Sequence, residues 1–320
     1  MPRQNLMAIV CLIAGSLQAT TVTQAAEQKI TRYVRFQVGD NVAYGIVDGD
    51  NVRQIDGDLF GKWQPTERTY PLGSVKLLVP SPRPTQVLAL AGNYKSHLGG
   101  GNYVATITTT TKVTTNVGSG QTTTDSNTVV DTEKPGEAPT KFRTPQIFFK
   151  PPSCLIASGE TIVIPPGTND VHYEAELVIV IGRQAKNVSP EKAHDYILGV
   201  ACGNDVSARD WQKNDVQWWR AKGCDTFGPV GPMIVSGLNY DDLRVQLRLN
   251  GKVMQDERTS QMINNVPTIV SFASRHLTLE PGDLIYTGTP GRTSAIKSGD
   301  EVEVEIEGVG ALKNRVAAKE

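Results

Sequence analysis

An unbroken apolar run at residues 177–181, with the sequence LVIVI, constrains the fold of this 320-residue chain more than any other feature. Every residue of the run after Leu177 is β-branched, a composition typical of a buried strand. Glu174 and Glu176 lie immediately before it. Because residues two apart in a strand point to the same face, the sequence predicts two carboxylates side by side at the start of a buried strand.

Such a pair costs free energy through like-charge repulsion, above all next to a buried segment. Solvent, a basic partner or a divalent cation could each relieve it. Oxygen ligands of this kind favour the hard cations Mg²⁺, Mn²⁺ and Ca²⁺. From the E-x-E pattern alone, solvated acids at a half-exposed strand end are the simpler interpretation, because short motifs recur by accident.

Short extended segments, separated by proline and glycine, make up most of the rest of the chain. They alternate in polarity across residues 30–80 and, very regularly, across residues 299–316, as strands do. Helical patterns are few and short, and the clearest follow Ser189 and Pro267. Because there is also no GxGxxG or Walker loop, the sequence predicts a mixed β fold with few helices (α+β) and excludes a doubly wound α/β protein.

The first 26 residues have the layout of a secretory signal peptide. Arg3 forms a charged n-region, residues 6–17 are apolar or small, and residues 23–25 (TQA) resemble a small-x-small cleavage site. The apolar stretch is too short for a membrane-spanning helix, and no later segment is apolar for long enough. We therefore expect an exported protein, periplasmic or secreted, that has no membrane contact once residues 1–26 are removed.

Behind the signal peptide we expect a small N-terminal β-rich domain at residues 27–82 and a larger domain at residues 83–320. A threonine-rich insertion interrupts the larger domain at about residues 105–132. Low complexity is typical of a disordered loop, but threonine favours strands, and a GSGQ segment separates two threonine-rich arms. We favour a β-hairpin, acting as a flap or as an oligomer contact.

Charge and cysteine content exclude two classes of protein. The net charge is −1 at pH 7 and no basic residues cluster, so a nucleic-acid partner is not expected. Cys154, Cys202 and Cys224 remain after removal of the signal peptide, an odd count without a CxxC motif. A disulfide framework therefore does not organise the fold, although one bridge could form.

Two later segments could complete a site around the glutamate pair. Asp205 follows an apolar stretch and a glycine in GVACGNDVSARDWQ, and a third carboxylate could leave a metal ion open to water and substrate. Taken alone, Asp205 could equally be a turn or cap residue. Lys222, in AKGCDTFGPVGP, could neutralise excess negative charge and bind a substrate oxyanion, or could be a solvated surface lysine.

Six blocks of sequence occur in an order that resembles the fumarylacetoacetate hydrolase family. They are GNYKSH (92–97), FFKPPS (148–153), HYEAELVIVIG (172–182), GNDVSARDWQ (203–212), AKGCDTFGPVGP (221–232) and YTGTPGR (286–292). The resemblance covers about residues 83–316. The short N-terminal unit also resembles one that precedes the catalytic domain in many members.

The resemblance implies a mixed β-sandwich roll, usually a homodimer, that holds Mg²⁺, Mn²⁺ or Ca²⁺ between an E-x-E pair and a later aspartate. In this sequence those positions are Glu174, Glu176 and Asp205. It also implies small substrates that are 2-oxo or 1,3-dicarbonyl acids. Cleaving a C–C bond beside a carbonyl leaves an enolate, which a Lewis-acid metal stabilises.

The resemblance further implies roles for residues around the metal. Lys222 matches a lysine near the substrate oxyanion, and Thr289 matches a loop residue that contacts the substrate carboxylate. Arg209 and Gln212 match positions that line the pocket. His97, in an N-Y-x-x-H motif, matches the base that activates water in hydrolytic members.

The sequence departs from the family pattern just after His97. Hydrolytic members often carry a glutamate three residues further on, where this chain has Gly100. Glu133 or Glu137, at the end of the insertion, could substitute for it in space, and His97 could equally be a loop histidine with a structural role. The departure puts water activation in doubt more than metal binding.

Three functions therefore stay open. The first is a divalent-metal-dependent hydrolase that cleaves a C–C bond in an acylpyruvate, a fumarylacetoacetate-like compound or another 1,3-dicarbonyl or 2-oxo acid. The second is a decarboxylase, isomerase or hydratase of a 2-oxo acid in aromatic-compound degradation, which needs an enolate but no activated water. The third is a non-catalytic exported protein that binds an oxo acid.

Overall fold

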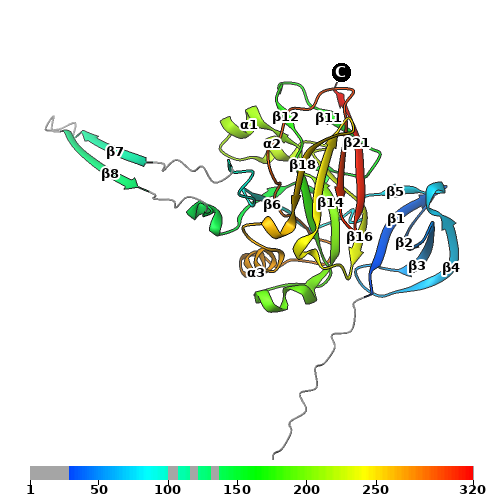
Figure 1. Cartoon of the computed structure of the whole chain (residues 1–320). Coiled ribbons are helices and arrows are strands. Elements are labelled where there is room, and N and C mark those ends of the chain that lie inside the picture. Colours follow the sequence, from blue (N-terminus) through cyan, green and yellow to red (C-terminus); the bar gives the residue numbers. More distant parts are fainter. Residues whose placement is uncertain (1–28, 100–106, 116–121, 131–136, 320) are drawn as a thin grey trace, which may run out of the picture.

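The computed structural model describes residues 29–99, 107–115, 122–130 and 137–319. Strands dominate it and its α-helices are short (Figure 1), so the expected fold class, mixed β with few helices, is confirmed. The expected signal peptide, residues 1–26, lies outside the described residues. Within the described part of the chain, no helix is long and apolar enough to cross a membrane.

Twelve strands form one large sheet. In chain order they are β1 (Thr31–Val38), β2 (Asn41–Asp48), β3 (Asn51–Gly57), β4 (Trp63–Pro71), β5 (Lys76–Leu78), β6 (Val87–Ala91), β9 (Gln146–Lys150), β10 (Leu155–Ile156), β13 (Ala175–Ile181), β14 (Ile197–Asn204), β16 (Gly228–Ser236) and β19 (Leu284–Tyr286). The main path across the sheet is β4-β3-β2-β1-β16-β14-β13-β19-β6-β9, with β5 beside β1 and β10 beside β16.

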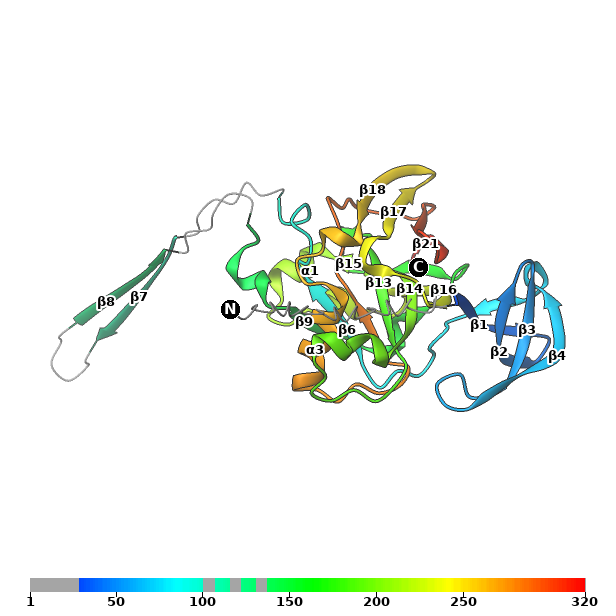
Figure 2. The same cartoon turned by 60° about the horizontal axis from the view of Figure 1, so that its bottom comes forward.

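The N-terminal strands continue this sheet. β1 pairs antiparallel with β16, where Thr31 lies opposite Ser236 and Tyr33 opposite Ile234. The strands β1 to β4 lie together at one end of the molecule (Figure 2). The strands expected within residues 30–80 are thus present, and main-chain hydrogen bonds join them to the main body, while the domain boundary at residue 82 stays a prediction.

A second sheet has five strands. These are β11 (Thr161–Ile164), β17 (Arg244–Leu249), β18 (Lys252–Arg258), β20 (Glu301–Ile306) and β21 (Gly310–Ala318), in the spatial order β11-β21-β20-β17-β18. Asn250 and Gly251 form the turn between β17 and β18, with positive φ angles of 52° and 78°. Such angles suit the Asn-Gly turn that the sequence predicts.

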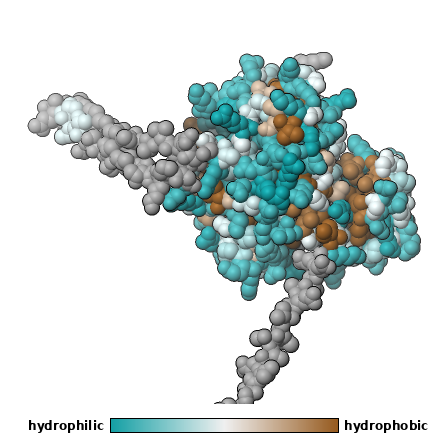
Figure 3. Space-filling model, viewed as in Figure 1, coloured by the Kyte–Doolittle hydropathy of each residue, from teal (hydrophilic) through white to brown (hydrophobic). Residues whose placement is uncertain are grey.

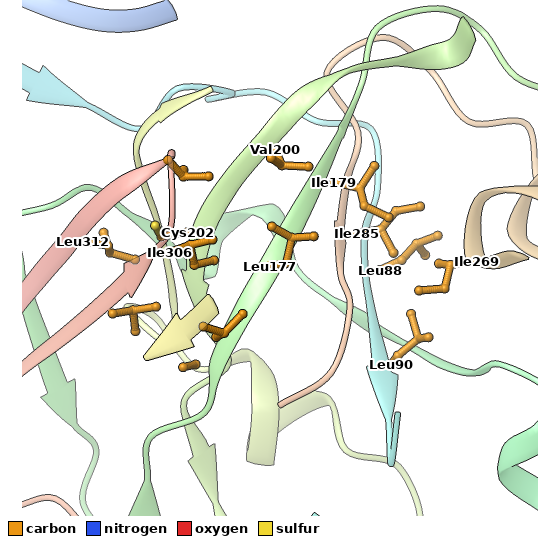
Figure 4. Close-up of a cluster of buried hydrophobic side chains, with 14 of the residues drawn as sticks. Leu88, Leu90, Leu177, Ile179, Val200, Cys202, Ile269, Ile285, Ile306 and Leu312 are labelled. Carbon is orange, nitrogen blue, oxygen red and sulfur yellow. The ribbon is translucent and has the colours of Figure 1, made fainter. Parts of the chain in front are cut away.

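The main hydrophobic core joins the two sheets (Figure 4). Leu177 of β13 and Cys202 of β14 belong to one cluster of buried residues with Ile306 of β20 and Leu312 of β21. Burying one such aliphatic side chain contributes about 1.5–3 kcal/mol to stability, so this cluster is a large part of what holds the sheets together.

β13 is buried on both faces, as its unbroken apolar run predicts. Leu177 and Ile179 pack in the core between the sheets. Val178 and Val180, which point the other way, pack in a second cluster that includes Tyr33 of β1. Burial on both sides removes any need for polar alternation, and it makes β13 a rigid support for the residues at its start.

The α-helices are α1 (Arg209–Asn214), α2 (Trp219–Gly223) and α3 (Val266–His276). The helix expected after Pro267 is α3, which has this proline in its first turn and is capped by the Asn265 side chain. The helix expected after Ser189 is a 3₁₀ helix, Pro190–Tyr196. Cys154, Cys202 and Cys224 are all free, so the bridge that the sequence allowed is not formed.

Two shorter strand pairs complete the fold. β12 (Val171–His172) pairs antiparallel with β15 (Ser207–Ala208). β7 (Ile107–Thr115) and β8 (Thr122–Val130) pair with each other in one antiparallel register, from Ile107 opposite Val130 to Thr115 opposite Thr122. The threonine-rich insertion therefore contains the two strands of the predicted hairpin, and its role as a flap or oligomer contact stays a prediction.

The surface seen in Figure 3 is mostly hydrophilic over the main body, and hydrophobic residues gather at the N-terminal strands. Val42 of β2 is one of the exposed hydrophobic residues of that unit.

Candidate metal centre and active site

The three carboxylates predicted to bind a metal meet at the start of β13. Glu174 lies just before the strand and Glu176 within it, and antiparallel pairing places Ala175 opposite Asn204 of β14. The residue after Asn204 is Asp205, whose N–H donates to the Glu174 carbonyl at 2.9 Å. One oxygen from each of the three carboxylates lies within 4.8 Å of the others. The strand register therefore brings together residues that are about thirty positions apart.

All three carboxylates are buried: Glu174 is 4 % exposed, and Glu176 and Asp205 are 0 % exposed. Cations compensate two of them. The Lys222 ammonium, itself buried, donates to Glu174 Oε2 at 2.6 Å and to Asp205 Oδ2 at 2.7 Å. Arg209 Nη2 of α1 donates to Glu174 Oε1 at 2.5 Å.

Lys150, at the end of β9, is a buried residue of this cluster to which the sequence analysis assigned no role. Its Nζ donates to Asp205 Oδ1 at 2.6 Å, to the Phe227 carbonyl at 3.1 Å and to the Lys222 carbonyl. Burial disfavours a charge on Lys150, but the charge and hydrogen bond of Asp205, together with the neighbouring Cys154 and Glu176, outweigh this effect and raise the lysine pKa above its usual value. One feature of the sequence could have indicated Lys150 as a residue of the site. It lies two positions after Phe148 in the same strand, so both side chains point to the same face of that strand.

The two glutamates of the E-x-E pair have opposite electrostatic environments. Burial, followed by the charges of Asp205 and Glu174, raises the pKa of Glu176 well above its usual range. Burial also acts on Glu174, but the charges of Lys222 and Arg209 outweigh it and hold the Glu174 pKa well below its usual range. Cations thus surround Glu174, whereas Glu176 faces mainly other carboxylates.

The hydrogen bonds of Glu176 indicate whether these residues suit a metal ion. Glu176 Oε2 accepts a hydrogen bond from the Gly288 N–H at 2.7 Å, but Oε1 is buried and has no hydrogen-bond partner among the described residues. An unsatisfied buried carboxylate oxygen is costly, and a cation would satisfy it. Three carboxylates are also the hard donor set that Mg²⁺, Mn²⁺ and Ca²⁺ prefer, so the residues fit such an ion.

A cavity of about 290 Å³ opens on this cluster. Its polar lining includes Glu174, Lys141 and Gln146, together with five residues that were singled out from the sequence, namely His97, Arg209, Gln212, Lys222 and Thr289. Glu176 and Asp205 do not line it. The structure therefore brings the predicted substrate-binding residues to one cavity, with the two fully buried carboxylates behind its lining.

Part of the cavity lining is aromatic. Phe148 of β9 and Trp218, the residue before α2, both line the cavity, and their rings are 5.4 Å apart in an edge-to-face arrangement. The Lys222 ammonium lies 5.3 Å from the Phe148 ring centre. Neither aromatic residue was expected at the site from the sequence, because an aromatic residue in a strand or loop is more often part of a core.

His97 lies at the edge of the cluster. Its Nε2 is 3.9 Å from Glu174 Oε1, and its Nδ1 is 2.8 Å from the Gly291 carbonyl oxygen. Glu137, one of two glutamates considered as its helper, instead forms an ion pair with Arg143 at 2.7 Å. The other candidate, Glu133, and Gly100 lie outside the described residues.

Comparison with known proteins agrees with the sequence blocks. The family model described as "Fumarylacetoacetate (FAA) hydrolase C-terminal" matches residues 111–317, well over half of the chain. A second model, described as "Rv2993c-like, N-terminal", matches residues 31–80.

Individual relatives and solved structures extend over most of the chain. Protein Rv2993c of Mycobacterium tuberculosis is 39% identical over 298 residues, which cover 90% of this chain and 98% of that protein. The crystal structure of 2-hydroxyhepta-2,4-diene-1,7-dioate isomerase from Mycobacterium marinum has a TM-score of 0.73 and 38% identity, covering 90% of this chain and 99% of that one. Maleylpyruvate hydrolase from Sphingobium sp. SYK-6, solved with manganese(II) and pyruvate, has a TM-score of 0.67 and 25% identity, covering 90% of this chain and all of that one. The family model, the relatives and the fold agree, and the chain therefore belongs to the fumarylacetoacetate hydrolase family.

Proposed function

We propose that this protein is a divalent-metal-dependent enzyme that forms the enolate of a small 2-oxo acid, and that it moves a proton within that substrate. The observation that carries the proposal is the buried cluster of Glu174, Glu176 and Asp205 directly behind a cavity lined by His97 and Lys222. When bound, a divalent cation would supply Lewis-acid stabilisation for the enolate oxygen.

The residues of the cavity wall suit an anionic substrate. An ammonium has three N–H donors, and Glu174 and Asp205 accept two of those of Lys222, which leaves one for a substrate oxyanion. Arg209 and Gln212 also line the cavity, where Arg209 Nη1 donates to Gln212 Oε1 at 2.8 Å, and they add further donors. Phe148 and Trp218 cover the apolar part of the substrate and exclude water from it.

His97 is the proton acceptor in this proposal. Its Nε2 lies on the Glu174 side of the cavity, while its Nδ1 is bound to a neutral carbonyl and not to a carboxylate. A carboxylate partner would make an imidazole more basic, and activating a water molecule demands more basicity than removing a proton already made acidic by the carbonyl beside it. This reasoning favours isomerisation or tautomerisation, and the related isomerase from Mycobacterium marinum supports it.

C–C bond hydrolysis is the second candidate. The cavity and the carboxylate cluster serve either reaction, because both pass through an enolate, and maleylpyruvate hydrolase supports this alternative at 25% identity. A protein that binds an oxo acid without turning it over is the third possibility. It predicts stabilisation by the ligand without any product.

A metal-supplemented assay tests the proposal. The chelator-treated protein is mixed with oxaloacetate, whose enol absorbs in the ultraviolet, or with acetylpyruvate, each with and without Mg²⁺ or Mn²⁺. We expect metal-dependent enol–ketone interconversion without acid products by mass spectrometry. Formation of pyruvate and acetate from acetylpyruvate would instead establish hydrolysis.

Variants of two glutamates complete this assay. Glu176→Ala should abolish turnover, and Glu67→Ala, at a glutamate side chain that is 98% exposed, should leave it unchanged. Full activity of the Glu176→Ala protein would overturn the metal assignment. Binding of either acid without any product would favour the binding protein.

Cleavage after residue 26 with export of the mature protein, and assembly as a homodimer, are part of the same proposal and rest on the sequence. Cell fractionation with N-terminal sequencing of the mature protein tests export, and light scattering of the purified protein tests the dimer. A cytoplasmic protein with an intact N-terminus, or a monomeric mass, would contradict these two expectations.

A further inference from the structure

A chain of hydrogen bonds connects β18 to the ring of His97. Glu257 of β18 accepts a hydrogen bond from the Ser96 hydroxyl. Ser96 Oγ in turn accepts the Gly291 N–H at 2.9 Å, and the Gly291 carbonyl lies 2.8 Å from His97 Nδ1. Two neighbouring residues, Ser96 and His97, thus hold the N–H and the C=O of one glycine that is almost two hundred positions further along the chain.

The last contact decides which ring nitrogen carries the proton. A carbonyl oxygen accepts hydrogen bonds and cannot donate one, so Nδ1 of His97 must carry the hydrogen. In the neutral imidazole, Nε2 then has the free lone pair. The 3.9 Å between Nε2 and Glu174 Oε1 is too long for a hydrogen bond, so this lone pair stays available in the cavity.

Ser96 and Glu257 hold the backbone of Gly291 in place, and the Gly291 carbonyl in turn holds the His97 ring. The single hydroxyl proton of Ser96 is used by the Glu257 carboxylate, which leaves the oxygen lone pairs of Ser96 for the Gly291 N–H. Gly291 has a φ of 60°, a left-handed conformation that side-chain-bearing residues rarely adopt. Without the bond from Ser96, this flexible residue would be free to turn its carbonyl away from His97.

β18 also contacts the loop that contains Thr289, Pro290 and Gly291 at a second point. Gln255 precedes Glu257 by two positions and therefore shares its face of β18. Its Nε2 donates to Thr289 Oγ1 at 2.9 Å and to the Pro290 carbonyl, and its Oε1 accepts the Ala175 N–H at 3.0 Å. β18 therefore sets the distance between the strand that carries the glutamate pair and the loop that ends at Gly291.

We propose that Ser96 and Glu257 are positioning residues that hold His97 in the Nδ1–H tautomer through the Gly291 carbonyl. Neither residue lines the cavity, so neither is expected to touch the substrate. The inference rests on the proposed function, in which His97 accepts a proton at Nε2. It adds a device in which a serine, a glutamate and a backbone carbonyl determine which nitrogen faces the substrate.

Nitrogen-15 NMR of the histidine rings tests the tautomer without any substrate. The full chain has four histidines, and a His97→Gln sample assigns the signals of His97. At about pH 8.5, where an ordinary imidazole is neutral, the wild-type ring should show the Nδ1–H pattern. The His97 ring of the Ser96→Ala protein should show a mixture of the two tautomers. An Nε2–H pattern in the wild type, or an unchanged pattern in the Ser96→Ala protein, would overturn the inference.

Kinetics test the consequence for catalysis with the substrate that the assay above identifies. Ser96→Ala and Glu257→Ala should each lower kcat by about 10- to 100-fold while KM changes by less than about threefold, because only the orientation of the base is lost. Ser96→Thr keeps the hydroxyl and should restore most of kcat. In a His97→Gln background, Ser96→Ala should have no further effect, because both changes act through one ring.

Ser260→Ala is the matched control, since Ser260 also donates to a carboxylate, Asp242, at 2.7 Å, but on the exposed surface. It should leave kcat unchanged. Equal losses from Ser96→Ala with and without His97 would show a merely structural effect. If no substrate is turned over while the NMR patterns are as expected, the proposed function fails and the positioning of His97 stands.

Discussion

The ion pairs behind the cavity and the ion pairs on the five-stranded sheet use the same chemical groups in opposite surroundings. Lys150 and Asp205 are 2.6 Å apart and both side chains are 0% exposed. On the sheet, Lys313 and Glu303 are 2.8 Å apart with side chains 50% and 22% exposed, and Arg248 bridges Glu303 and Glu305 of β20.

Burial changes what such a pair does. An exposed pair gains little, because water screens it and the side chains lose entropy. A buried pair is costly to assemble and still more costly to break, because the remaining charge has no solvent. The buried cluster is thus poorly explained by stability alone, and it makes sense as a site that holds charge ready for a metal and a substrate.

The largest effect on stability should come from Lys150→Met, which keeps the volume of the side chain and removes its charge. Asp205 then loses one of its two cations while fully buried, so we expect the free energy of unfolding to fall by about 3–5 kcal/mol. Chemical denaturation measures this loss. Lys313→Met, the exposed counterpart, should change the free energy of unfolding far less, because water screens its pairs, and equal effects of the two changes would remove the distinction between the regions.

Glu176→Gln should separate metal binding from folding. The amide has the shape of the carboxyl group and can still accept the hydrogen bond from the Gly288 N–H, so the free energy of unfolding in chelator should change by less than about 1 kcal/mol. The loss of an anionic ligand should weaken Mn²⁺ binding by at least about 100-fold, or about 2.7 kcal/mol, in calorimetry. Glu303→Gln on the sheet is the control, and Mn²⁺ affinity unchanged by Glu176→Gln would disprove the site.

Two adjacent tryptophans allow the same comparison between a residue of the cavity and a residue of the surface. Trp218 lines the cavity beside Phe148, whereas Trp219 is 69% exposed. Trp218→Ala should raise KM about tenfold, or about 1.4 kcal/mol, because it removes an apolar contact with the substrate. Trp219→Ala should leave KM within about twofold, and a larger effect there would place the substrate elsewhere.

The smallest effect should come from the exposed pairs themselves. Arg248→Ala should cost less than about 1 kcal/mol. A hydrogen bond from Lys313, opposed by partial burial, lowers the pKa of Glu303 below its usual value. A group whose pKa is lower in the folded state stabilises the fold at pH values above its unfolded pKa and loses this contribution as the pH falls. In denaturation experiments below about pH 4, the cost of Arg248→Ala should therefore shrink, and a cost that grows there would contradict this sign.

Local sequence was sufficient for β13 and its glutamate pair. The apolar run predicted a buried strand, and the two-residue period predicted that both carboxylates share a face. The Asn250–Gly251 turn and helix α3, which has a proline in its first turn, were also predicted from local sequence, because each depends on the backbone preferences of a few neighbouring residues.

The local sequence did not decide the surroundings of the pair. By their own segments, Asp205 could be a turn residue and Lys222 a surface lysine, and only the resemblance to a family favoured roles in the site. Both residues are buried in the fold. Glu137, considered as a helper of His97, pairs with Arg143 instead. Lys150 received no role, because nothing near it in the sequence indicates Asp205, 55 positions away.

The sequence by itself therefore determined the strand, the spacing of its two carboxylates and the order of the motifs, because these depend on neighbours within a few residues. Only the tertiary structure decided which cations compensate Glu174 and Asp205, and which oxygen of Glu176 stays unsatisfied. It also decided that the Gly291 carbonyl orients His97 across 194 positions of chain. The physical reason is that hydrogen bonds and burial depend on distance in space. The pairing of β13 with β14, and the hydrogen bond from Ala175 of β13 to the Gln255 side chain of β18, set those distances.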